Sequence, residues 1–220
     1  MREVSRAAAL CVALVICAFV ALPPLASLAQ HLFAAHMLQH LLLIVIAAPL
    51  IAFSRAFERL RGRFAEWLAR PAVAWLLFTA TFLFWHWPAA FRWAAEAEAT
   101  RMLELSTIVL SACIFWSVAL AGDNRRRLSQ GAAALFVTTA AVVTDLPGVV
   151  MLFAPTAICT MPQEDAWHWG ISPLEDQQIA GLLMWVPANL VFFAFATWLL
   201  ALWLSDNGRD KTRLNIPVIT

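Results

Sequence analysis

Six stretches of apolar residues alternate with short polar or basic segments along this chain. Each stretch has about the length of a helix that crosses the hydrocarbon core of a bilayer, which takes roughly 20 residues. We therefore predict an all-α, polytopic bundle of six transmembrane helices, with a membrane domain over residues 31–204 between an N-terminal segment (1–30) and a tail (205–220). The predicted helices cover about Ala7–Leu22, Leu32–Phe53, Ala72–Phe91, Met102–Ala121, Ala132–Phe153 and Ile179–Leu204.

The first apolar stretch has two interpretations. Arg2 and Arg6 precede it, and Ser27-Leu28-Ala29 follows it as a small-x-small sequence of the kind found at signal-peptide cleavage sites. Cleavage there would leave five helices, whereas an uncleaved segment, which we favour, gives six. In both cases the chain enters the membrane again near His31 from the same side.

Composition supports a membrane protein and excludes several other classes. The chain is 62% hydrophobic and 13% charged, and its net charge of +1 gives no indication of nucleic-acid binding. Its four cysteines form no C-x-x-C pair, which excludes a zinc knuckle or a thioredoxin-like motif. Eleven tryptophans can supply the aromatic rings that are enriched at both membrane interfaces.

The basic residues predict the orientation of the chain. Only Arg92 and Arg101 fall on one side of the predicted bundle. Because loops rich in Lys and Arg stay in the cytoplasm, both termini are expected to be cytoplasmic, in the inner membrane of a bacterium. The other thirteen of the fifteen basic residues share the cytoplasmic side: Arg2, Arg6, Arg55, Arg59, Arg61, Arg63, Arg70, Arg125, Arg126, Arg127, Arg209, Lys211 and Arg213.

Two histidines stand four residues apart at the start of the second predicted helix, in His36-Met-Leu-Gln-His40. At this spacing both side chains lie on one face of a helix. Ionisable groups in a membrane segment are unfavourable and usually face a bundle interior. The histidines are therefore either hydrogen-bonded to neighbouring helices or part of a metal or haem site.

Other polar and sulfur-containing residues are expected at the same depth. With about 1.5 Å of rise per residue, His36, His86, Glu104, Asp145 and Met184 each lie within about two turns of the outer surface. A thioether beside imidazoles suits Cu(I) better than zinc or a hard cation. We predict a copper site in this layer with the ligands His36, His40, His86, Met37 and Met184, supported by Glu104, Asp145 and Asp176.

Simpler interpretations exist for the acidic residues. Glu104 near a helix N-terminus is favoured by the helix macrodipole alone, but it could also accept the free N–H of a ligating histidine. Asp145 stands in Asp145-Leu-Pro147-Gly148, which we expect to interrupt the fifth helix and which Asp145 could cap. Ser172 and Glu175 form a capping box, and Pro173 fits the first position of the last helix.

Three motifs together resemble the CtaG-type cytochrome c oxidase assembly factor family. They are His36-Met-Leu-Gln-His40 with Ala48-Pro49-Leu50, then Trp85-His86-x-Pro88, and finally Ser172-Pro-Leu-Glu-Asp-Gln-Gln178-x-Ala-Gly181-x-x-Met184-Trp185-x-Pro187. The resemblance runs from about His31 to Leu204. In one departure, the family pattern has Glu-His where this chain has Glu104-Leu105, so a metal site here would have fewer imidazoles or use His31 or a methionine.

The resemblance implies a non-enzymatic assembly factor of the bacterial inner membrane. Its expected partners are a haem-copper oxidase subunit and a periplasmic copper chaperone, and its expected cargo is Cu(I) held near the periplasmic face. Two alternatives remain: a b-type haem protein with axial His40 and His86, and a copper permease. The permease is less favoured because few polar residues continue through the inner half of the predicted helices.

Overall fold

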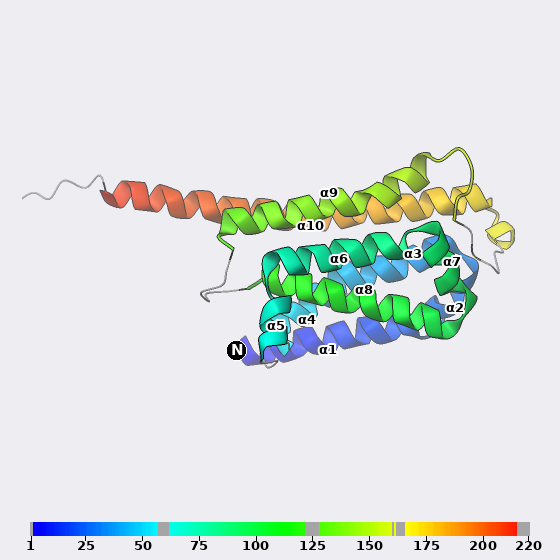
Figure 1. Ribbon diagram of the computed structural model, residues 1–220, viewed down its shortest axis with the longest axis horizontal. Coiled ribbons are helices and arrows are strands. Elements are labelled where there is room, and N and C mark those ends of the chain that lie inside the picture. Colours follow the sequence, from blue (N-terminus) through cyan, green and yellow to red (C-terminus); the bar gives the residue numbers. More distant parts are fainter. Residues whose placement is uncertain (1, 57–61, 122–127, 160, 162–165, 215–220) are drawn as a thin grey trace, which may run out of the picture.

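The computed structural model describes residues 2–56, 62–121, 128–159, 161 and 166–214. Every regular element in these residues is helical, which confirms the predicted all-α class. The elements, labelled in Figure 1, are α1 (Arg2–Ala21), α2 (Leu25–His31), α3 (Phe33–Leu41), the π-helix η1 (Leu42–Ala47), α4 (Ala48–Ser54), α5 (Arg63–Leu68), α6 (Pro71–Trp85), α7 (Pro88–Glu96), α8 (Glu98–Ala119), α9 (Gln130–Phe153), the 3₁₀ turn η3 (Ala166–Trp169) and α10 (Pro173–Leu214).

Five helical runs are long and apolar enough to span a membrane, and a bent pair makes a sixth. α3, η1 and α4 form one continuous run, Phe33–Ser54, which is the second predicted helix. α1 packs against this run through η1 and α4, and α10 packs along α9 and α3. The long helices lie side by side with their axes roughly aligned, and the short helices α2 and α7 close one end of the bundle (Figure 1).

The third predicted helix does not continue to Phe91. α6 ends at Trp85, and α7 begins at Pro88 after a bend of 73°. Proline has no N–H for the carbonyl four residues earlier, so it favours the first turn of a new helix over the interior of an old one. This break leaves His86 as the residue that follows the last turn of α6.

The predicted interruption of the fifth helix is not observed. α9 runs from Gln130 to Phe153 with Pro147 inside it. It crosses α10 at a contact between two glycines: a Cβ on Gly181 would lie 2.6 Å from the Gly148 carbonyl oxygen. Glycines allow such close approach of two backbones, and the extensive packing of α10 holds α9 together across its proline.

The last helix begins where the capping box predicts. Glu175 accepts a hydrogen bond from the Ser172 backbone N–H at 2.7 Å, and the Glu175 N–H donates to the Ser172 hydroxyl at 3.3 Å. Pro173 is the first residue of α10. The helix continues to Leu214, ten residues beyond the predicted end at Leu204 and into the predicted tail.

The start of α1 and the end of α10 lie at the same end of the bundle, together with α5, and α2, α7 and η3 lie at the opposite end (Figure 1). This arrangement agrees with the chain path that the basic residues predict. Arg59 and Arg61 and the basic run 125–127, on which much of that prediction depends, lie outside the described residues.

Candidate functional site

Asp176 determines where the histidine-bearing helix begins. In the first turn of α10, its two carboxylate oxygens accept the backbone N–H groups of Phe33 at 2.6 Å and Ala34 at 3.0 Å. The first N–H groups of a helix have no partner within that helix, so this carboxylate caps α3 from a different helix. His36 follows one turn later and takes its position from this cap.

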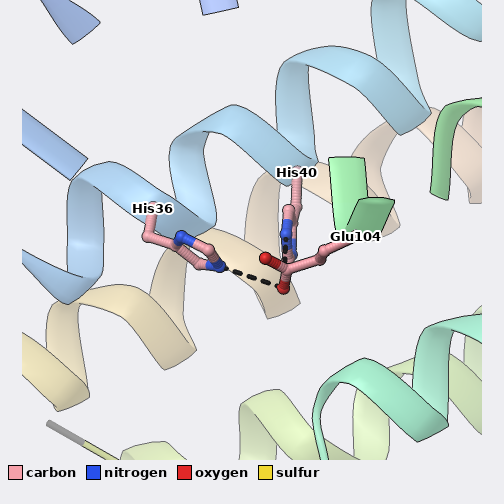
Figure 2. A group of neighbouring side chains, drawn as sticks. All are labelled: His36, His40 and Glu104. Carbon is pink, nitrogen blue, oxygen red and sulfur yellow. Dashed lines mark hydrogen bonds and ion pairs between the residues drawn. The ribbon is translucent and has the colours of Figure 1, made fainter. Parts of the chain in front are cut away.

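His36, His40 and Glu104 converge between α3 and α8 (Figure 2). The His36 Nε2–H donates to Glu104 Oε1 at 3.2 Å, and His40 Nε2 lies 3.3 Å from the same oxygen. One ligand atom from each residue lies within 4.8 Å of the other two. The i, i+4 spacing thus brings both imidazoles to one carboxylate, as the sequence predicts for the histidine pair.

His86 joins this group from the end of α6. Its ring lies 5.4 Å from the His40 ring, measured between centroids. Its Nδ1–H donates to the Phe82 carbonyl oxygen at 2.7 Å, which makes Nε2 the nitrogen that carries the lone pair in neutral histidine. A backbone carbonyl that fixes the tautomer in this way is a common feature of metal-binding histidines.

The two predicted methionine ligands occupy different positions. Met184 on α10 lines a small cavity of about 30 Å³ together with His40 and Thr144. This volume is enough for an ion or about one or two waters. Met37 is buried in the main hydrophobic core. Met184 therefore shares a cavity with His40, and Met37 as a ligand stays a prediction.

The polar atoms of this group are deeply buried and incompletely paired. His36 and Glu104 are fully buried, and His36 Nδ1, His40 Nδ1, His86 Nε2 and Glu104 Oε2 have no hydrogen-bond partner among the described residues. Buried polar atoms in native proteins nearly always have a partner, so several unpaired atoms at one point suggest a missing ligand. Imidazole donors suit zinc, copper, iron and nickel, so the residues are compatible with the predicted ion without being specific to it.

The remaining supporting residues have other partners. The Asp145 carboxylate accepts a hydrogen bond from Asn189 Nδ2 at 2.8 Å, which links α9 to α10. Asp176 acts on the site only through the cap of α3. Glu104, by contrast, contacts a histidine, as we expect of a supporting carboxylate. Its oxygen also lies close enough to both imidazoles to bind the same metal ion.

Leu105 occupies the position at which the resemblance leads us to expect a histidine. It is 6% exposed and packs in a second apolar cluster with Val20, Ala35 and Leu43. This cluster lies between α8 and the first three helices, on a different face of α8 from Glu104. The departure therefore replaces a polar group with an apolar contact, and His86 supplies the third imidazole of the group.

Two buried residues that the sequence did not single out, Gln39 and Trp116, hold the histidine-bearing run in place. Gln39 donates to the Val20 carbonyl oxygen at 2.6 Å and so ties α3 to α1. Trp116 on α8 donates to the Ile44 carbonyl oxygen at 2.8 Å. A polar residue inside an apolar run indicates Gln39 in retrospect, whereas Trp116 looks in sequence like one more interfacial tryptophan.

The comparisons with known proteins agree with the resemblance. The family model described as "Cytochrome c oxidase caa3 assembly factor" matches residues 2–206, which includes the first apolar stretch. No curated protein and no solved structure matches the chain. Because the family model covers nearly the whole chain, this protein belongs to the cytochrome c oxidase caa3 assembly factor family.

Proposed function

We propose that this chain is a non-enzymatic assembly factor that binds copper between α3, α6 and α8 and passes it to a haem-copper oxidase subunit. The observation that carries the proposal is the convergence of His36, His40 and Glu104, with the unpaired Nε2 of His86 beside them. Family membership is the reason for proposing an oxidase as the partner, and the donor atoms are the reason for proposing a metal as the cargo.

Cu(I) is the proposed oxidation state. Imidazoles bind both Cu(I) and Cu(II), whereas a thioether favours Cu(I). Met184 lines the same cavity as His40, so its sulfur can complete a site built on the imidazoles. Glu104 would then accept histidine N–H groups or bind the ion directly, and its negative charge favours a cation in either role.

A bare ion fits this site better than haem does. A bis-imidazole haem holds its macrocycle between two axial histidines. The His40 and His86 rings are 5.4 Å apart between centroids, and the cavity beside His40 holds about 30 Å³. A cavity of this volume is far smaller than a macrocycle, which supports the copper proposal over the haem alternative.

The proposed location is the inner membrane of a bacterium, with both termini in the cytoplasm. In this orientation α2, α7 and the histidine group belong to the periplasmic half. Copper is the cargo of the protein, received from a periplasmic copper chaperone and given to the oxidase. Since His36 is fully buried, loading and release require side chains around the group to move.

Copper binding to purified protein tests the proposal. Cu(I) affinity is measured in detergent by competition with a Cu(I) chelator, for the wild-type chain and for His36→Ala/His40→Ala. We expect one equivalent of tightly bound copper, lost in the double variant, because removal of two ligands opens the site to water. His168→Ala, which removes an exposed histidine from η3, is the matched control and should bind normally.

A deletion strain provides the cellular test. Without this protein, oxidase activity should fall while transcription of the oxidase genes continues, and added copper should restore part of the activity by mass action. Unchanged copper stoichiometry in His36→Ala/His40→Ala would refute the proposed site. Normal oxidase activity in the deletion strain at limiting copper would refute the assembly role.

A further inference from the structure

The histidine-bearing run changes its hydrogen-bond register just after His40. From Leu42 to Ala47 it is a π-helix, in which each N–H bonds to the carbonyl five residues earlier. The Ala48 N–H accordingly donates to the Leu43 carbonyl oxygen. In this register the backbone N–H of residue 49 would donate to the Ile44 carbonyl oxygen, but residue 49 is a proline and has no N–H.

Trp116 supplies a donor for that carbonyl. Its indole Nε1–H donates to the Ile44 carbonyl oxygen at 2.8 Å, and both residues are buried. A buried carbonyl without a donor is strongly disfavoured, so the contact removes the main penalty of placing Pro49 after a π-helix. The indole of α8 thus takes the place of a backbone amide in a different helix.

This contact lies close to the histidine group. His40 and Ile44 line the same cavity, and the π segment begins two residues after His40. α8 therefore contacts the histidine-bearing run at two levels, with Glu104 at the imidazoles and Trp116 at the π segment. A change from π to α register would rotate the helix on one side of Ile44 relative to the other.

We infer that Trp116 is a positioning residue, whose indole N–H replaces the amide that Pro49 lacks, stabilises the π register of η1 and so holds His40 against Glu104. The inference deepens the proposed copper function and rests on it wherever copper affinity is measured. It concerns a residue outside the proposed ligand set, which acts through the backbone of the helix.

Trp116→Phe removes the N–H and retains most of the aromatic packing. We expect its Cu(I) affinity to fall about tenfold or more, as is typical when an outer partner of a metal ligand is removed. Trp75→Phe is the matched control, since the Trp75 indole donates to the Thr139 hydroxyl between α6 and α9. That variant also loses one indole hydrogen bond, and its affinity should equal that of the wild type.

Pro49→Ala in the Trp116→Phe background identifies the cause. Alanine restores a backbone N–H to the turn that contains Ile44, so most of the lost affinity should return. Pro49→Ala alone should bind copper normally, and unfolding temperatures in detergent establish that all four variants are folded. Recovered affinity could not come from filling the space left by the indole, because Pro49→Ala adds a backbone donor and no bulk near residue 116.

Three results would contradict either the inference about Trp116 or the proposed copper function, and they can be told apart. Equal affinities of Trp116→Phe and Trp75→Phe would show that the indole N–H does not matter. A loss in Trp116→Phe that Pro49→Ala does not restore would assign the effect to ring packing. If the wild-type chain binds no copper, the proposed function fails, and complementation of the deletion strain tests the inference instead. Trp116→Phe should then complement poorly and Trp116→Phe/Pro49→Ala should complement well. Any other result would show that the inference is wrong.

Discussion

Asp176 and Phe33 are joined by a 2.6 Å hydrogen bond from the Phe33 backbone N–H to the carboxylate. The bond connects the start of α10 to the start of α3, although 143 residues separate the two in sequence. Since His36 lies one turn into α3, the last helix of the bundle helps to set the orientation of the first ligand. Stability and site geometry are therefore coupled at this cap.

Asp176→Asn should destabilise the protein by about 1–2 kcal/mol, because an amide offers only one acceptor oxygen to the two N–H groups that the carboxylate caps. The free energy of unfolding is measured by denaturant titration in mixed micelles. Glu175→Gln is the control, since glutamine also completes a capping box, and it should change stability little. Equal stability of both variants would exclude the proposed cap.

The ligand roles predict an order of effects on copper affinity. His40→Ala should weaken Cu(I) binding most, because it removes a strong ligand. Glu104→Gln should have a smaller effect of about 10- to 100-fold, since the amide keeps the shape but loses the charge. Met184→Leu should have the smallest effect, because it conserves volume and removes only the sulfur. An order in which Met184→Leu is the most damaging would place the ion in the cavity instead.

Gly181→Ala should destabilise the α9–α10 pair by about 1–3 kcal/mol through overpacking. The new Cβ would lie 2.6 Å from the Gly148 oxygen and 2.9 Å from the Leu152 nitrogen, and backbone atoms cannot move aside easily. In Gly131→Ala the new Cβ meets the Trp203 ring at 3.3 Å, a side chain that can shift. Unfolding of both variants in mixed micelles should therefore show a loss only for Gly181→Ala.

Thiol labelling of intact cells tests the orientation. A membrane-impermeant reagent should label Glu98→Cys, at the exposed first residue of α8, and should not label Ala69→Cys, which follows α5. Native Cys159 contributes little background because it is buried, and burial raises the pKa of its thiol and lowers the thiolate fraction. The reverse labelling pattern would invert the topology and move the histidine group to the cytoplasmic half.

Several features of the candidate site can be predicted from the local sequence. The spacing of His36 and His40 places both on one face of any helix, and the motif Ser172-Pro-Leu-Glu175 fixes the start of α10 through contacts within four residues. Leu105 illustrates the limit of this approach. Only the packing of α8 against Val20 and Ala35 shows that its side chain belongs to a buried apolar cluster.

The sequence by itself determined the helical class, the approximate spans and the shared depth of the histidines, because hydrophobic length and helical periodicity are local properties. Tertiary structure alone decided which polar groups meet. Glu104 reaches both histidines, Asp145 pairs with Asn189, and Trp116 serves the carbonyl that Pro49 leaves without an amide. Such partners depend on how helices rotate and cross, and those angles arise from side-chain packing between segments that are distant in the chain.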